Sequence, residues 1–346
     1  MNRPSYLLPR LPGRVRAAFA LVAVVLAVHG CAAPRPTAPA AQEPGPVIAR
    51  DRDFMVIRAQ SSDNLASLAE RYLGDPHKAW WIAEFNGIDR VRAGQYVVIP
   101  LRLRNPLGVY ANGVQTVPIL CYHRFGNNRS RLTVTPAAFE AQMEYLARNG
   151  YQVVPLSRLT GFLEGKEPLP PKSVVITIDD GYRSTHEIAY PILKRYDFPA
   201  TVFLYSDFVG AADAMTWGQM QDLVRSGRIE IQPHSRTHSN LTQKLPGESD
   251  ANYRDRIRRE IETPIALIQD RLALASSSFA YPYGDVNESV AEQVAKQGLS
   301  LGVTVTPGGN AFYAYPLMLR RTMVFGNEDM ETFKSKLATF AQSAPR

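Results

Sequence analysis

The chain of 346 residues is poor in cysteine, with only Cys31 and Cys121. Two cysteines cannot form a disulfide framework or a cysteine-rich zinc module. Acidic residues are absent from positions 1–30, which contain four arginines followed by an apolar run at 17–28. That run has twelve residues, too few for the ~20 that a bilayer-spanning helix needs. The pattern favours a cleaved export signal over a transmembrane helix.

The net charge of +7, from 39 basic and 32 acidic residues, could suit a nucleic-acid partner. Four of the basic residues belong to the predicted signal at 1–30. Removing these four leaves 35 of the 39 basic residues against 32 acidic ones, a net charge of +3. Because no remaining segment is a dense basic run, we expect no nucleic-acid partner.

The apolar run ends in Val28-His29-Gly30-Cys31, which resembles the end of a bacterial lipoprotein signal. The resemblance implies that Cys31 is lipidated and anchors the chain to a membrane of the bacterial envelope, most simply the outer membrane facing the periplasm. The alternative is an ordinary signal peptide cut near residues 32–33. Residues 31–50 are rich in proline and alanine and are predicted to form a tether.

Residues 51–100 are predicted to form a small βααβ domain, with its first helix capped by Asp63. The domain resembles a LysM module in Asp63-Asn64-Leu65, in Asn86 and in the ending from Gly94 to Pro100. The resemblance implies binding of peptidoglycan or of a chitin-like glycan. The alternative is a small packing domain without a ligand.

After a connector at 101–116, strands and helices are predicted to alternate through residues 117–346. The expected strands are 117–122, 152–154, 174–178, 201–204, 229–231, 278–281 and 301–305. The expected helices begin at 136, 184, 217, 250 and 288, and a last one has Met330, Phe333, Leu337 and Phe340 on its apolar face. Repeated βα units favour a parallel sheet or barrel with its functional residues at the carboxyl ends of the strands.

Pairs of polar side chains that can bind a metal follow two of these strands. Asp179 and Asp180 come directly after the third strand, and neighbouring side chains point in different directions there, so one can face a metal and the other a water. His234 and His238 follow the fifth strand, and histidines four residues apart can share a cation. Each pair alone also fits a turn or a surface.

A third segment, Tyr281-Pro282-Tyr283-Gly284, ends a later strand. Such a turn can direct a backbone N–H outward as an oxyanion donor. In order and spacing, the three segments resemble the polysaccharide deacetylase family (the NodB homology domain, carbohydrate esterase family four). The resemblance covers about residues 117–340 and implies an α/β fold, an incomplete seven-stranded (β/α) barrel.

The resemblance also implies roles for these residues. Asp179 would be the catalytic base, while Asp180, His234 and His238 would bind a divalent metal, most often zinc. Tyr283 would donate its backbone N–H to the oxyanion. Tyr281 and Pro282 would line the substrate groove.

Two departures from the family pattern point to substitutes. Ala280 stands where many members have an arginine that pairs with the base, so Arg320 or Arg321 is a candidate for that pairing. No histidine follows His238, so His123 is the candidate general acid, with a positioning or core role as the alternative.

Two further residues have open or structural roles. Trp217 either stacks on a sugar or packs internally, and both interpretations stay open. Cys121 is expected to be a small buried apolar residue.

The combined prediction is a secreted, metal-dependent hydrolase that removes N-acetyl groups from an N-acetylglucosamine-containing envelope polysaccharide. The LysM resemblance favours peptidoglycan, whereas the Tyr122-His123 strand resembles the subgroup that deacetylates poly-N-acetylglucosamine. Two alternatives remain. One is an inactive glycan-binding lipoprotein, and the other is an esterase that removes O-acetyl groups with the same site.

Overall fold

A computed structural model describes residues 47–103, 105–128 and 130–342. The predicted signal, the lipidation site Cys31 and most of the predicted tether lie outside these residues. Within the described ranges, no helix is long and apolar enough to cross a membrane.

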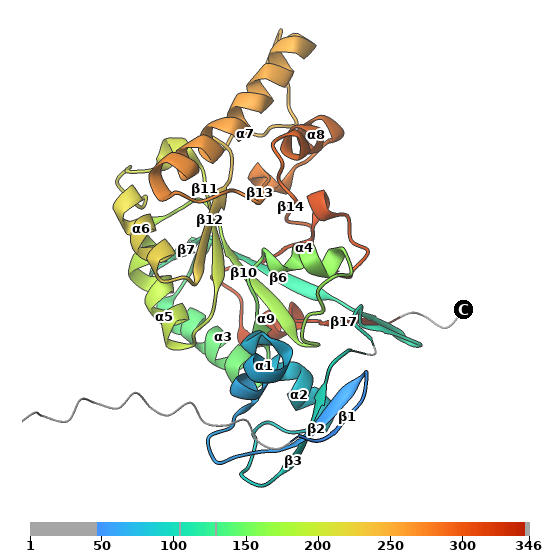
Figure 1. Cartoon of the computed structure of the whole chain (residues 1–346). Helices are drawn as coiled ribbons and strands as arrows, with labels where there is room; N and C mark the ends of the chain where they lie inside the picture. Colours follow the sequence, from blue (N-terminus) through green and yellow to red (C-terminus); the bar gives the residue numbers. More distant parts are fainter. Residues whose placement is uncertain (1–46, 104, 129, 343–346) are drawn as a thin grey trace, which may run out of the picture. The chain divides into compact units, whose positions relative to one another are not determined.

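A three-stranded antiparallel sheet and two helices form the segment from residue 47 to residue 100 (Figure 1). The strands are β1 (Val47–Arg50), β2 (Phe54–Arg58) and β3 (Tyr96–Pro100), and the helices are α1 (Leu65–Leu73), the short η1 (Pro76–Lys78) and α2 (Ala79–Asn86). The prediction that residues 47–50 belong to the tether is wrong, because they pair with β2. The folded segment therefore begins at Val47.

The cap of α1 differs from the prediction by one residue. Asn64, not Asp63, is the N-cap, and its side-chain oxygen accepts from the Ser67 N–H at 2.9 Å. Asp63 instead forms an ion pair with Arg71 at 2.9 Å. Asparagine and aspartate are equally good caps, so the sequence could not choose between these neighbours.

Asn86 links α2 to β3. Its amide nitrogen donates to the carbonyls of Ile82 and Val98, and its oxygen accepts from the Val98 N–H. These three bonds give Asn86 a structural reason to stand at the end of the helix.

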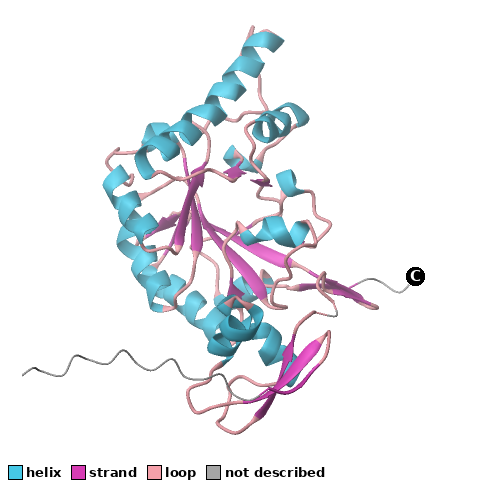
Figure 2. Cartoon of the chain, in the orientation of Figure 1, coloured by secondary structure: helices cyan, strands magenta, loops and turns pink. Residues whose placement is uncertain are grey.

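The remaining part of the chain is built on parallel strands (Figures 1 and 2). The main sheet contains β6 (Val117–Tyr122), β10 (Ser173–Ile178), β11 (Ala200–Leu204) and β12 (Ile229–Pro233), with β16 (Thr322–Met323) and β15 (Gly309–Asn310) beside β6 and β9 (Gln152–Val153) beside β10. A second sheet pairs β13 (Ser278–Ala280) with β14 (Leu301–Val303). Because the ladder breaks between β12 and β13, a continuous seven-stranded barrel stays a prediction.

Helices alternate with these strands, as the sequence predicts. They are α3 (Pro136–Arg148), α4 (Arg158–Leu163), η2 (Thr185–Ala189), α5 (Tyr190–Arg195), η3 (Ser206–Phe208), α6 (Trp217–Arg225), α7 (Asp250–Leu272), η4 (Pro282–Gly284), α8 (Glu288–Lys296), η5 (Pro316–Met318) and α9 (Met330–Ser335). Minor strands are β4 (Val109–Tyr110), β5 (Gly113–Gln115), β7 (Arg124–Phe125), β8 (Thr133–Val134) and β17 (Phe340–Gln342). Phe340 was expected on the last helix but lies in β17, since α9 ends at Ser335.

Successive side chains on the main strands point to opposite sides. One set packs with α3, α5 and α6 and includes Leu120, Ile176 and Val202. The other set joins residues from both sheets in one apolar cluster, including Ile119, Val175, Phe203, Ala280 and Val303. The two sheets therefore share one interior, and Asp179, in phase with Val175, points into it.

Candidate active site

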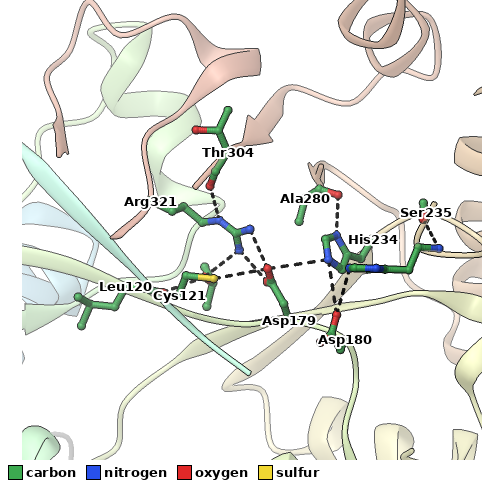
Figure 3. Close-up of polar contacts among 11 residues, drawn as sticks. Leu120, Cys121, Asp179, Asp180, His234, Ser235, Ala280, Thr304 and Arg321 are labelled. Carbon is green, nitrogen blue, oxygen red and sulfur yellow. Dashed lines mark hydrogen bonds and ion pairs between the residues drawn. The ribbon is translucent and has the colours of Figure 1, made fainter. Parts of the chain in front are cut away.

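Asp179 follows β10 directly and is buried with Arg321 (Figure 3). The Arg321 guanidinium donates from Nη1 to Oδ1 and from Nη2 to Oδ2 of Asp179, both at 2.7 Å. Its Nε donates to the Thr304 carbonyl at 2.8 Å. Of the two arginines that the sequence offered as partners for the base, the structure selects Arg321.

This pair fixes the charge of the carboxylate. Burial alone would raise the pKa of Asp179, but the adjacent guanidinium of Arg321, together with the nearby imidazoles of His234 and His123, outweighs burial and lowers the pKa well below its usual range. Asp179 is therefore ionised at neutral pH, which is the state that a general base requires.

Cys121 lies beside the same carboxylate. Its thiol is buried and donates to Asp179 Oδ2 at a distance of 3.4 Å. Burial raises the pKa of this thiol well above its usual value. The prediction of a buried residue is confirmed, but the side chain also gives the base a weak hydrogen bond.

Asp180, His234 and His238 come together at the carboxyl ends of β10 and β12. Their candidate ligand atoms lie within 4.8 Å of one another. Asp180 Oδ1 lies 3.7 Å from Nε2 of His234 and 3.5 Å from Nε2 of His238. This buried oxygen has no hydrogen-bond partner in the described part of the chain.

The protonation of these groups suits a cation. The His234 Nδ1 lies 2.7 Å from the Ala280 carbonyl, which can only accept, so we assign the proton to Nδ1 and leave the Nε2 lone pair free. Burial lowers the pKa of His234 to about 3 and also lowers the pKa of His238. Burial, with a smaller contribution from Asp179, raises the pKa of Asp180 to about 6 in the metal-free protein.

The donor set fits a divalent metal. Tetrahedral zinc with bonds of about 2.0–2.1 Å places its ligand atoms about 3.3–3.4 Å apart. The separations of 3.5 and 3.7 Å around Asp180 Oδ1 are close to this spacing. A cation between the three atoms would also give the unpartnered oxygen its missing contact.

Backbone geometry is unusual around the same atoms. Six non-glycine residues in the described ranges have a positive φ, and four of them belong to the site: Asp180, Ser235, His238 and Tyr283. Their φ angles lie between 61° and 73°, a region that side chains with a Cβ rarely adopt. The Ser235 hydroxyl accepts from the His238 N–H at 2.9 Å and supports one of these turns.

His123 lies close to the base. It belongs with Cys121 and Asp179 to a group whose potential ligand atoms are within 4.8 Å of one another. Its Nδ1 is buried and has no hydrogen-bond partner among the described residues. The structure thus places His123 in the site, and its role stays a prediction.

Tyr283 borders the metal-ligand set. Its ring centroid lies 4.8 Å from that of His238, and 60% of the residue is exposed. In the η4 turn, the amides of Gly284 and Asp285 donate to the Tyr281 and Pro282 carbonyls. The Tyr283 amide takes no part in those two bonds.

Tyr281 and Pro282 do not line an accessible groove. Tyr281 has no exposed surface, its hydroxyl donates to the Leu317 carbonyl at 2.9 Å, and Pro282 is also buried. Their predicted substrate contacts are corrected, because both side chains pack inside the protein. Trp217 is half-buried against the apolar core, in line with the packing interpretation, and its contact with a sugar stays a prediction.

Some residues of the site were not found from the sequence. Tyr205 lies beside His238, with 5.2 Å between the ring centroids. It directly follows β11, and its place at a strand end was the available signal. Glu260, which contacts the loop of the two histidines, gave no signal because it lies in a helix rich in charged residues.

Residues 166–302 match the family model described as polysaccharide deacetylase. Over these residues the chain is therefore similar to that family. The matched part includes Asp179, Asp180, His234, His238 and Tyr283, whereas His123 and Arg321 lie outside it.

Two curated relatives agree with this similarity. The chain is 31% identical over 192 residues to YxkH of Bacillus subtilis (strain 168), covering 56% of this chain and 65% of that protein. It is 25% identical over 250 residues to the poly-beta-1,6-N-acetyl-D-glucosamine N-deacetylase of Escherichia coli (strain K12), covering 62% of this chain and 37% of that protein. The chain therefore matches about two thirds of the length of YxkH and about a third of the length of the Escherichia coli protein.

A solved structure extends the likeness to the fold. The Streptococcus pyogenes deacetylase PplD, in complex with acetate, matches with a TM-score of 0.58 and 26% identity. The match covers 65% of this chain and 99% of that one. The α/β deacetylase fold is therefore confirmed.

Proposed function

We propose that this protein is a metal-dependent hydrolase that removes N-acetyl groups from an N-acetylglucosamine-containing polysaccharide of the cell envelope. One observation supports this proposal above all. An ionised carboxylate held by Arg321 lies beside a compact set of one carboxylate and two neutral imidazoles. A general base next to a metal-binding set suits the hydrolysis of an amide.

Asp180, His234 and His238 would hold the metal, and zinc suits their nitrogen and carboxylate donors. When bound, a divalent metal polarises a carbonyl and lowers the pKa of water. Three protein ligands suit a catalytic site, because structural zinc sites usually have four.

The chain's own residues would handle the protons. Asp179 accepts the proton of the attacking water, since Arg321 holds it ionised and Cys121 and Arg321 fix its two oxygens. The backbone N–H of Tyr283 stabilises the negative charge on the acetyl oxygen. His123 gives a proton to the leaving sugar amine, a role for which its unpartnered Nδ1 leaves it free.

The proposed substrate is a poly-N-acetylglucosamine-like polymer, because the Escherichia coli relative is named as an N-deacetylase of that polymer. Peptidoglycan is the second candidate, favoured by the LysM-like pattern at residues 51–100. The helices and sheet of that segment and the link made by Asn86 are compatible with a LysM module. We further propose that Cys31 anchors the protein to the outer membrane, facing the periplasm.

Acetate release from defined glycans tests the function. The purified full-length protein, loaded with Zn²⁺ or treated with a chelator, is incubated with poly-N-acetylglucosamine, peptidoglycan and O-acetylated xylan. We expect metal-dependent acetate release from the first or the second. Release from xylan alone would instead favour the O-acetyl esterase, and no release from any glycan would support the inactive glycan-binding alternative.

Two histidine variants test the assignments. His234→Ala should abolish both metal binding and turnover, and unchanged turnover would contradict the ligand assignment. His123→Ala should keep metal binding but lower kcat by about 10²–10⁴-fold, so near-normal turnover across pH would reject the acid role. His186→Ala is the matched control, because His186 lies outside the proposed site. It belongs to η2, and its Nε2 lies 3.8 Å from Oδ2 of Asp222 in α6.

A further inference from the structure

The loop from His234 to His238 contains two of the three proposed metal ligands, and its backbone is held from two sides. On the carbonyl side, the Ser206 N–H donates to the Ser235 carbonyl at 3.2 Å and the Asp207 N–H donates to the Arg236 carbonyl at 2.9 Å. Both donors belong to η3, at the end of the neighbouring strand β11. On the amide side, the N–H groups of Arg236 and Thr237 are both held by a single residue from a distant helix.

That residue is Glu260 of α7. Its Oε2 accepts from the N–H groups of Arg236 at 3.1 Å and of Thr237 at 2.9 Å. Its Oε1 accepts from the Thr237 hydroxyl at 3.0 Å. Both carboxylate oxygens therefore bind residues between the histidines, and together they hold Arg236 and Thr237.

The loop is shaped to receive a carboxylate. Ser235 and His238, which flank the two donating amides, have φ angles of 69° and 63°. Left-handed residues next to right-handed ones turn successive N–H groups toward one point, which makes a concave site for an anion. The same turns direct the two imidazoles toward Asp180 on the other side of the loop.

The location of Glu260 on α7 also calls for an explanation. It is only 6% exposed, and its helix neighbours Ile257 and Ile261 are buried in an apolar cluster. A buried carboxylate is costly unless its oxygens are hydrogen-bonded. The bonds to the loop offset that cost and couple the burial of α7 to the geometry of the histidines.

We infer that Glu260 is a positioning residue of the metal site. It sets the spacing of His234 and His238 through the backbone between them, without touching the metal itself. This inference rests on the proposed function, since it takes the two histidines as metal ligands. It adds a residue that acts on metal affinity rather than on the chemical step.

Metal affinity of the purified full-length protein tests the inference directly, by Zn²⁺ titration against a chelating dye. Glu260→Ala should weaken Zn²⁺ binding by about 10–100-fold, the usual effect of removing a group that orients metal ligands. Glu260→Gln should weaken Zn²⁺ binding less than Glu260→Ala, because the side-chain amide oxygen can still accept from both N–H groups. The weakening should still be about threefold or more, because that oxygen carries no charge.

Turnover gives a second measurement. Excess Zn²⁺ should restore most of the kcat of Glu260→Gln, because the residue positions ligands and does not contact the substrate. Glu262→Ala is the matched control: it removes a carboxylate of the same helix, which pairs with Arg258 at the surface, and should leave Zn²⁺ affinity unchanged.

The outcomes separate the two proposals. If the wild-type protein binds no Zn²⁺, the metal site itself is wrong. If the wild type binds Zn²⁺ and a folded Glu260→Ala binds it within twofold, the positioning role is overturned. Should Glu260→Ala fail to fold by circular dichroism, Glu260→Gln decides, and an affinity within twofold of wild type again overturns the role.

Discussion

Removal of Arg321 is the most demanding test of the site. Arg321 has no exposed surface, Asp179 is 2% exposed, and the pair shares two bonds of 2.7 Å. Arg321→Met keeps an unbranched side chain but leaves the carboxylate buried without its countercharge. Breaking one partner of such a pair costs about 3–5 kcal/mol, so we expect the free energy of unfolding to fall by that amount at neutral pH.

The pH dependence of the loss gives its cause. In the wild type the pKa of Asp179 is lowered, so its contribution to stability is present above its unfolded pKa of about 4 and is lost as the pH falls through the folded value. In Arg321→Met, burial without a partner should raise the folded pKa above the unfolded value. The variant then loses stability, relative to the wild type, as the pH rises from about 4.

Urea denaturation of both proteins in chelator, at about pH 4.5, 6 and 7.5, measures this difference and keeps metal binding out of it. The acid limb of the kcat/KM profile of the metal-loaded variant should also move to higher pH, because the base now ionises later. A stability loss below about 1 kcal/mol, or an equal loss at every pH, would refute the reasoning.

Two controls separate this effect from general damage. Arg195→Met breaks an ion pair with Glu140 in which both side chains are about half exposed, and it should change stability by only about 0–1 kcal/mol. The double variant Asp179→Asn, Arg321→Met removes both buried charges, so it should recover most of the lost stability while remaining inactive.

Three further predictions follow from single contacts. Zn²⁺ affinity should be constant above about pH 6.5 and fall about tenfold per pH unit below the Asp180 pKa of about 6, because protons then compete with the metal for the carboxylate. Zn²⁺ titrations over a pH series measure this, and an affinity that does not change with pH would contradict it. Gly302→Ala would place a Cβ 2.6 Å from the Leu317 carbonyl oxygen and should lower the free energy of unfolding by about 1–3 kcal/mol, measured by urea denaturation. An unchanged urea midpoint would show that the segment around Leu317 moves aside without cost. Thr216→Ala removes the N-cap of α6 and should cost about 1 kcal/mol, while Thr216→Ser should melt like the wild type.

The sequence predicted the residues at strand ends well, for a geometric reason. Asp179 and Asp180 follow β10 and His234 follows β12, and the carboxyl ends of parallel strands meet at one edge of a sheet. The alternation of apolar strands and helices therefore placed these residues at one edge of the sheet, and the family resemblance supplied their expected roles.

Contacts that depend on register were not predictable. Only one of Arg320 and Arg321 can face the interior, and the choice depends on the pairing of Thr322 with Leu120, about 200 residues apart in sequence. Tyr281 looked like a groove residue because of its place in the turn. Its burial follows from the Leu317 carbonyl 36 residues further on, which no local pattern reports.

The missed strand β1 and the missed role of Glu260 have different causes. Val47–Arg50 follows a proline-rich run and became a strand only through pairing with β2. Glu260 is one of many charged residues on α7, and only its burial against Arg236 and Thr237 distinguishes it. Both depend on partners distant in space, which composition and periodicity do not describe.

The four left-handed residues of the site have a practical consequence for engineering. Each non-glycine residue in that conformation costs about 1–3 kcal/mol, and glycine would relieve the cost at Asp180, Ser235, His238 and Tyr283. A library selected for heat resistance alone would thus be drawn toward glycine at two proposed metal ligands. Selection schemes for a more durable enzyme should hold these four positions fixed, or they will enrich stable proteins that no longer bind metal.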